Sequence, residues 1–137
     1  MSHPQTFGCG IDVVELSRFR HAMNRGGSAF LRRIFTSQEQ AYARARPRTQ
    51  LLHLAGRFAA KEAVIKAISQ INPSQAPSMK QVEVRNDRLG RPHILLHNGA
   101  LLRMKIFVSL SHVRSVAVAS AIAMRNGSMT SMAPRSS

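Results

Sequence analysis

The chain has 137 residues, of which 44% are apolar, and its 20 lysines and arginines outnumber six acidic residues to give a formal net charge of +14. This length suits one domain, and the apolar content excludes an intrinsically disordered chain. The charge predicts an anionic partner, either nucleic acid, an acidic protein, a phosphorylated metabolite or an anionic membrane. Aromatic residues make up only 5% of the chain, which argues against binding single-stranded nucleic acid by base stacking.

A single cysteine, Cys9, excludes an internal disulfide and a cysteine-based zinc site. The first residues lack the charged and apolar pattern of a signal peptide. No apolar run reaches the length of a membrane span. We therefore expect a cytoplasmic protein with no membrane partner.

Apolar periodicity, with glycine and proline as breaks, predicts an α+β fold. In chain order we expect a strand over 7–14, a helix over 15–25, a helical turn over 30–35, helices over 36–46 and 49–69, a hairpin of strands over 82–85 and 92–97, a short helical connection over 98–104, and strands over 105–110 and 115–123. This order indicates an antiparallel sheet with helices packed on one face. We expect one domain over residues 1–124 and a disordered tail over 125–137.

Two acidic residues do not fit a plain structural role. Glu62 has Phe58, Ala59 and Ile65 as its helical neighbours, so its carboxylate lies on an inward stripe, where it needs an ion partner or a metal. From spacing alone, an ion pair with Lys66 one turn later is the favoured interpretation.

Asp12 interrupts an apolar strand, where aspartate is disfavoured. It could equally cap the helix that follows. Mg²⁺ usually binds one or two protein carboxylates and completes its shell with water and phosphate oxygens. Asp12 and Glu62 together could supply these carboxylates.

Basic and polar residues near these carboxylates suit phosphate. Arg57, Lys61 and Lys66 surround Glu62 on the predicted helix, although a solvated charged face is the usual explanation of such a pattern. Ser111 and His112 end a strand and could reach phosphate oxygens. They could instead form a nucleophile pair or a plain polar turn.

Five segments together resemble the holo-[acyl-carrier-protein] synthases, the small bacterial type of 4′-phosphopantetheinyl transferase. They occur in the order of that family and are GIDVVELSRF at 10–19, FTSQE at 35–39, LAGRFAAKEAVIKA at 54–67, GRP at 90–92 and VSLSH at 108–112. The resemblance implies transfer of 4′-phosphopantetheine from coenzyme A to a serine of an acidic apo acyl carrier protein. Adenosine 3′,5′-bisphosphate would be released, and the enzyme would be a homotrimer.

The same resemblance implies roles for individual residues. Asp12 and Glu62 would hold Mg²⁺, and Glu62 and Lys66 would be catalytic. The implied coenzyme A ligands are Arg57, Lys61, Lys66, Gly90, Arg91, Pro92, Ser111 and His112. Arg18 would bind the carrier protein.

The main alternative is a basic RNA- or ribosome-binding module without catalysis, which explains the charge but not two inward carboxylates. A second alternative is a family member that binds coenzyme A without catalysis. The presence of both carboxylates and Lys66 argues against it.

Overall fold

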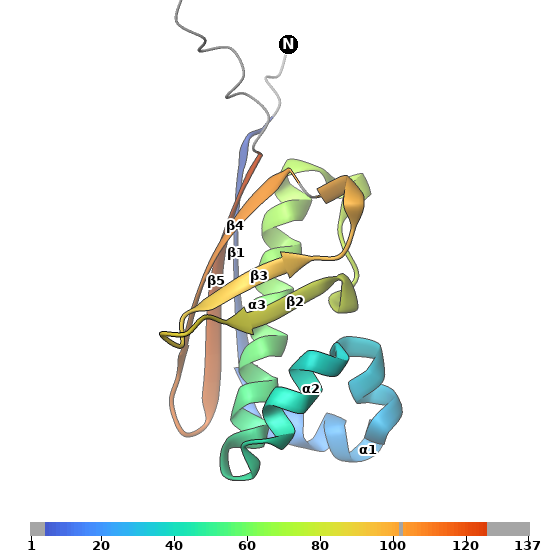
Figure 1. Ribbon diagram of the computed structural model, residues 1–137, viewed down its shortest axis with the longest axis vertical. Coiled ribbons are helices and arrows are strands. Elements are labelled where there is room, and N and C mark those ends of the chain that lie inside the picture. The colour runs from blue at the N-terminus through green and yellow to red at the C-terminus, as the bar shows by residue number, and fades with distance from the viewer. Residues whose placement is uncertain (1–4, 102, 126–137) are drawn as a thin grey trace, which may run out of the picture.

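The computed structural model describes residues 5–101 and 103–125 (Figure 1). Its helices and strands are β1 (Phe7–Glu15), α1 (Leu16–Ile34), α2 (Ser37–Arg44), α3 (Gln50–Ile71), β2 (Val82–Asn86), β3 (Pro92–Leu96), β4 (Met104–His112) and β5 (Val116–Arg125). Short 3₁₀ turns lie at Pro47–Thr49, Pro73–Gln75, Met79–Gln81 and Gly99–Leu101. Apart from Arg125, the last residue of β5, the predicted tail over 125–137 lies outside the described residues.

Local signals set the helix boundaries. The gap predicted between the helical segments 15–25 and 30–35 is instead a kink at Gly27, whose φ of 58° and ψ of −146° suit glycine. The helix resumes at once, so the two predicted segments form one kinked helix, α1. A capping box starts α2, because Glu39 N donates to Thr36 Oγ1 at 3.2 Å and Thr36 N donates to Glu39 Oε1 at 2.9 Å. No helix among the described residues is long and apolar enough to span a membrane.

The predicted α+β class is confirmed, with the strands divided between two sheets. β1, β5 and β4 form an antiparallel sheet in that order, and β2 pairs with β3 in a separate hairpin. In Figure 1, α3 runs along the three-stranded sheet, and the β2–β3 hairpin crosses α3. The central helix therefore borders the sheet, the hairpin and α2.

The contact between α3 and the sheet is built from small side chains. The buried alanines of these elements are Ala55, Ala59, Ala60, Ala63 and Ala67 of α3 and Ala117, Ala119, Ala121 and Ala123 of β5. Larger core residues lie around this contact, among them Phe19, Phe35, Leu54 and Ile68. Because alanine keeps the helix near the strands, side chains from both can meet around one site.

Candidate active site

Two glycines bring β1 into backbone contact with α3. A Cβ added at Gly8 would lie 1.9 Å from the carbonyl oxygen of Ala67, and one added at Gly10 would lie 2.0 Å from that of Ala63. Neither position leaves room for a side chain. Asp12 follows on the same face of β1, since strand side chains alternate between faces, and it lies nearer the start of α3.

Asp12 and Glu62 line one cavity at this point, together with Arg18, Phe19 and Phe58. Burial raises the pKa of the Glu62 carboxyl, and the negative charge of Asp12 raises it further. Residues 50 positions apart in the sequence thus form a pair of carboxylates in a partly closed site. That they hold a metal ion stays a prediction.

Lys66 pairs with Asp12 and not with Glu62. Its Nζ lies 3.1 Å from Asp12 Oδ1 and donates to the carbonyl oxygen of Ile11 at 2.9 Å. Among the described residues no ion pair joins Lys66 to Glu62. The interpretation from helical spacing alone was therefore wrong, because the strand packed on the helix supplies the partner.

The carboxylate pair fits a magnesium ion better than a metal bound by protein alone. Within residues 5–101 and 103–125, no group of three or more His, Cys, Asp or Glu side chains is placed to hold a metal ion. A structural zinc site takes four protein ligands, and calcium takes six to eight oxygens. Mg²⁺ typically uses one or two carboxylates and completes its shell with water and phosphate oxygens.

A second cavity, of about 250 Å³, opens between α3, the β2–β3 hairpin and the end of β4. Its lining includes Arg57, Gly90, Pro92, Ser111 and His112. These five are among the residues that the family resemblance assigns to coenzyme A. The fold therefore gathers into one place residues from three separate sequence motifs.

Arg57 is a buried cation that forms no ion pair within residues 5–101 and 103–125. It is 4% exposed, and its Nη2 donates to Asn86 Oδ1 at 3.0 Å. Its guanidinium carbon lies 4.1 Å from the centroid of the Tyr42 ring. Among the described residues its Nε has no hydrogen-bond partner. Burial lowers the pKa of this guanidinium, and a bound phosphate would supply the missing negative charge and acceptor.

Arg91, the remaining residue of the GRP motif, is not among the residues that line this cavity. It is exposed, and its Nε lies 2.9 Å from Asp87 Oδ2. Gly90 has a φ of 80°, which lets the hairpin turn close. The structure thus brings Gly90 and Pro92 into the cavity and leaves Arg91 in an ion pair of the turn.

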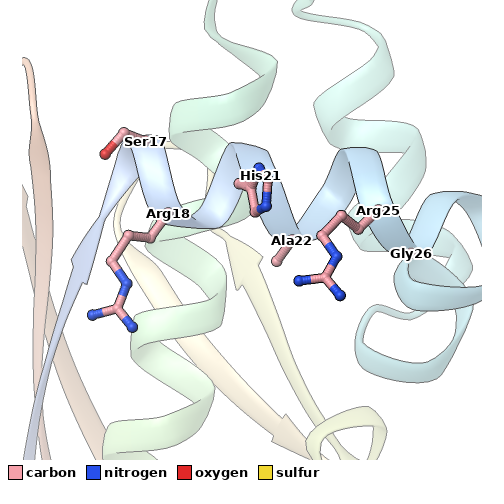
Figure 2. A pocket seen from close by; sticks show the side chains of 6 residues that line it. All are labelled: Ser17, Arg18, His21, Ala22, Arg25 and Gly26. Atoms are coloured by element: carbon pink, nitrogen blue, oxygen red, sulfur yellow. The ribbon is translucent and has the colours of Figure 1, made fainter.

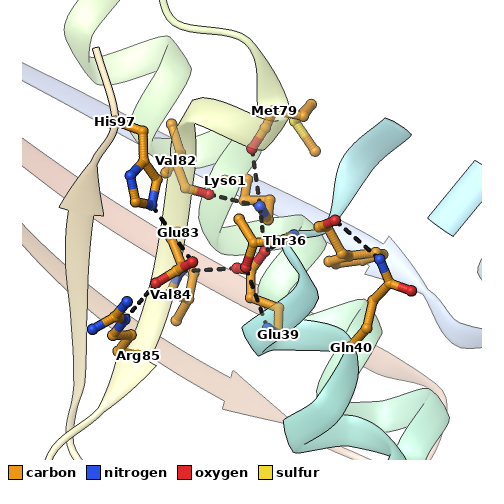
Figure 3. Close-up of polar contacts among 11 residues, drawn as sticks. Thr36, Glu39, Gln40, Lys61, Met79, Val82, Glu83, Val84, Arg85 and His97 are labelled. Carbon is orange, nitrogen blue, oxygen red and sulfur yellow. Dashed lines mark hydrogen bonds and ion pairs between the residues drawn. The ribbon is translucent and has the colours of Figure 1, made fainter. Parts of the chain in front are cut away.

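Lys61, which the family resemblance assigns to coenzyme A, has its ammonium group inside the protein core. It is fully buried, and its Nζ lies 2.6 Å from Glu39 Oε1 (Figure 3). The same Nζ donates to the carbonyl oxygens of Met79 at 2.9 Å and Val82 at 2.6 Å. An ammonium group has three donors, and all three are used inside the protein. Lys61 therefore ties α3 to α2 and β2.

Glu39 and Glu83 are buried carboxylates whose part in this network the sequence analysis missed. Glu39 Oε2 also accepts from Val84 N at 2.9 Å. Burial alone would raise the pKa of Glu83, but hydrogen bonds from Thr36 and Arg85 outweigh it and hold that pKa below its ordinary value. Glu39 also belongs to the capping box of α2, a local Thr-x-x-Glu pattern. Its contacts with α3 and β2 depend on tertiary packing and have no sequence signal.

Arg18 lies where the carboxylate cavity meets a basic surface of α1. It lines both that cavity and a shallow hollow shared with His21 and Arg25. Figure 2 shows Arg18 and Arg25 extending to the same side of the helix. An acidic partner bound on this surface would lie beside Asp12 and Glu62.

Comparison with known proteins identifies a family match. Residues 8–121 match the model of the 4′-phosphopantetheinyl transferase superfamily. The holo-[acyl-carrier-protein] synthase of Protochlamydia amoebophila is 39% identical over 120 residues, which cover 85% of this chain and 97% of that protein.

Two solved structures are similar in both fold and sequence. One is the ACPS–CoA complex of Chronobacterium ammoniagenes, at 30% identity and a TM-score of 0.74 over 88% of this chain and 98% of that one. The other is a holo-(acyl-carrier-protein) synthase of Bacillus anthracis in complex with CoA (3′,5′-ADP). It is 31% identical with a TM-score of 0.73, over 88% of this chain and 99% of that one.

Proposed function

The chain belongs to the 4′-phosphopantetheinyl transferase superfamily, and we propose that it transfers 4′-phosphopantetheine from coenzyme A to a serine of apo acyl carrier protein, with Mg²⁺ and with release of adenosine 3′,5′-bisphosphate. One observation carries this proposal. α3 borders both a cavity with two carboxylates and a cavity lined by the buried cation Arg57. Glu62 and Arg57 are five residues apart, a rise of about 7.5 Å along the helix. Such a spacing suits a pyrophosphate at one cavity and the rest of the nucleotide at the other.

Each residue then has a defined task. Asp12 and Glu62 would hold Mg²⁺, which when bound neutralises the pyrophosphate and favours attack on phosphorus. Lys66 contacts the pyrophosphate and stabilises charge on the leaving phosphate. The nucleotide end of coenzyme A is held by the lining of the second cavity, namely Arg57, Gly90, Pro92, Ser111 and His112.

The transfer step forms one bond and breaks another. The serine oxygen of the carrier attacks the phosphorus that bears the pantetheine arm. The bond from this phosphorus to the nucleotide phosphate breaks, and adenosine 3′,5′-bisphosphate leaves. Glu62 accepts the serine proton, directly or through a water.

The decisive experiment mixes the protein with apo acyl carrier protein, coenzyme A and Mg²⁺ and measures the carrier by mass spectrometry. We expect the mass of one phosphopantetheine to be added, and none on a carrier whose acceptor serine is alanine. No adduct, together with an RNA gel shift that persists at physiological salt, would favour the basic binding module instead, since non-specific binding weakens steeply with salt.

Replacing Arg18 with alanine should weaken carrier docking selectively. We expect the KM for the carrier to rise about tenfold, as for loss of a charge contact at an interface, with little change in the KM for coenzyme A. Raising the salt concentration should weaken carrier binding more than coenzyme A binding. Arg44→Ala, which removes an exposed arginine from α2, is the control. Equal changes in both KM values would show that Arg18 does not take part in docking the carrier.

The outer face of the three-stranded sheet is apolar and supports the proposed homotrimer. Ile11 is 62% exposed, Val13 60% and Phe107 47%. Phe7 and Ile122 add to this outer apolar face, which no described helix covers in Figure 1. An apolar patch of this kind usually marks an interface, and a second copy of the chain offers a matching surface.

Replacing Val13 with glutamate should dissociate this assembly. The carboxylate would be buried without a partner at the interface, at a cost of several kcal/mol. Light scattering coupled to size-exclusion chromatography should then give the mass of one chain instead of three. Val113→Glu, at an exposed valine between β4 and β5, is the control and should keep the wild-type mass. A Val13→Glu protein of wild-type mass would contradict the use of this face.

A further inference from the structure

Lys66 holds the carboxylate that the proposed metal ion needs. Its Nζ lies 3.1 Å from Asp12 Oδ1, so one of the two metal-binding carboxylates already has a cation beside it. The same ammonium donates to the carbonyl oxygen of Ile11 at 2.9 Å. The proposed function, however, requires Asp12 at the metal and Lys66 at the pyrophosphate. An exchange of partner by Lys66 would meet both requirements.

The second contact of Lys66 is with the free edge of the sheet. Among the strands that the structure describes, β1 lies at the edge of its sheet, beside β5. Lys66 covers the carbonyl oxygen of Ile11, and Gln70, one turn later on α3, accepts a hydrogen bond from Cys9 N at 2.9 Å. Lys66 is therefore held in a resting position by one backbone acceptor and one carboxylate. Both acceptors can be satisfied otherwise, the carbonyl by water and the carboxylate by a metal ion.

The solvent exposure of Lys66 and Asp12 allows this ion pair to open. The side chain of Lys66 is 51% exposed and that of Asp12 18%, whereas both Lys61 and Glu39 are 0% exposed. A partly exposed ion pair is weak and its partners can move into water. The fully buried pair cannot open without leaving a charge unpaired in the core. The same helix thus carries one fixed lysine and one that is free to exchange.

We propose that Lys66 is a placeholder cation, which neutralises Asp12 until the metal ion binds and then exchanges Asp12 for a phosphate oxygen of coenzyme A. This inference rests on the proposed function. In the resting state Lys66 supplies a positive charge beside the carboxylates of Asp12 and Glu62. In the loaded state the ion takes over Asp12, and the released ammonium is available one helical turn from Glu62. A positive charge would therefore reach the phosphate at the stage when the carboxylates are already bound to metal.

The first test is metal affinity without coenzyme A, measured with Mn²⁺, which accepts the same oxygen ligands as Mg²⁺. Because the ion must displace the lysine, we expect Lys66→Met to bind Mn²⁺ about fivefold more tightly than the wild type. Lys80→Met, which removes an exposed lysine that forms no ion pair among the described residues, is the matched control. It should stay within about twofold of the wild type.

The second test separates exchange from simple charge repulsion. On the wild type without coenzyme A, acetylation of each lysine is followed by peptide mass spectrometry as Mg²⁺ is added. Lys66 should react at least about twofold faster at saturation, because its ammonium is no longer held by Asp12. Lys80 and Lys105, both exposed, should not change. An unchanged or slower reaction at Lys66 would overturn the proposal.

A third variant distinguishes this failure from failure of the metal assignment. Asp12→Asn should lose Mn²⁺ binding. If the wild type binds Mn²⁺ and Asp12→Asn does not, but Lys66→Met binds it as the wild type does, only the placeholder role is wrong. If neither the wild type nor Asp12→Asn binds Mn²⁺, the metal assignment and the placeholder role are both wrong.

Discussion

Replacing Glu62 with glutamine is expected to lower the rate of phosphopantetheine transfer about 10³-fold, because the amide can neither accept the serine proton nor hold a metal ion as a carboxylate does. The same variant should unfold at a slightly higher denaturant concentration than the wild type. Burial and Asp12 raise the pKa of Glu62, so the ionised carboxylate destabilises the folded protein at neutral pH.

The sign of the pH dependence follows from proton binding. Between the ordinary pKa of a glutamate and the raised pKa of Glu62, the folded state holds more protons than the unfolded state. The contribution of Glu62 to the free energy of unfolding therefore falls as pH rises through this window. Glutamine does not titrate, so the gain of Glu62→Gln should be present at neutral pH and vanish near pH 4. Because the carboxyl is partly exposed, the gain should stay below about 1 kcal/mol.

Urea unfolding of the metal-free proteins at both pH values, with transfer assays beside it, measures these effects. Glu15→Gln is the matched control, because it changes an exposed carboxylate that lines the same cavity at the end of β1. It should keep transfer within about threefold and show no gain in stability. Mg²⁺-dependent transfer at the wild-type rate in Glu62→Gln would show that Glu62 takes no part in the reaction.

Replacing Gly10 with alanine should be among the most damaging single-methyl changes in the protein. The added Cβ would lie 2.0 Å from the carbonyl oxygen of Ala63 and 3.0 Å from Lys66 Cβ. The first of these neighbours is helix backbone, which cannot turn aside. We expect a loss of at least about 3 kcal/mol in the free energy of unfolding. That is a large share of the stability of an ordinary domain.

Activity should also fall in Gly10→Ala at temperatures where it stays folded. Moving β1 away from α3 would separate Asp12, two residues along the strand, from Glu62. Urea unfolding and transfer rates at low temperature test both effects. Gly99→Ala is the control, since nothing lies within 4 Å of its added Cβ. A Gly10→Ala protein within about 1 kcal/mol of the wild type would show that the strand and the helix can separate at little cost.

The buried ion network explains how the two cavities are kept at a fixed spacing. Lys61 joins α3 to Glu39 of α2 and to the backbone of Met79 and Val82 at the start of the hairpin. Arg57 and Glu62 lie on the same helix, on either side of this lysine in the sequence. Removing one charge of a fully buried pair would leave the other unpaired, so this network stabilises the framework of the site.

Local signals in the sequence determined the start of α2, the kink in α1 and the turn of the hairpin. The Thr36–Glu39 capping box, the kink at Gly27 and the turn that needs a positive φ at Gly90 each depend on residues within a few positions of one another. Such contacts form in the same way whatever the rest of the chain does. The ordered motifs also determined the family, because their residues are individually common but specific as a set.

Only the tertiary structure decided which charges meet. Helical spacing favoured a Glu62–Lys66 pair, but β1 brings Asp12 to Lys66. The sequence also could not separate Lys61 from Glu62, although one is locked in the core and the other lines a cavity. Residues adjacent in a helix point about 100° apart. Their environments are therefore set by strands and loops that lie far away in the sequence.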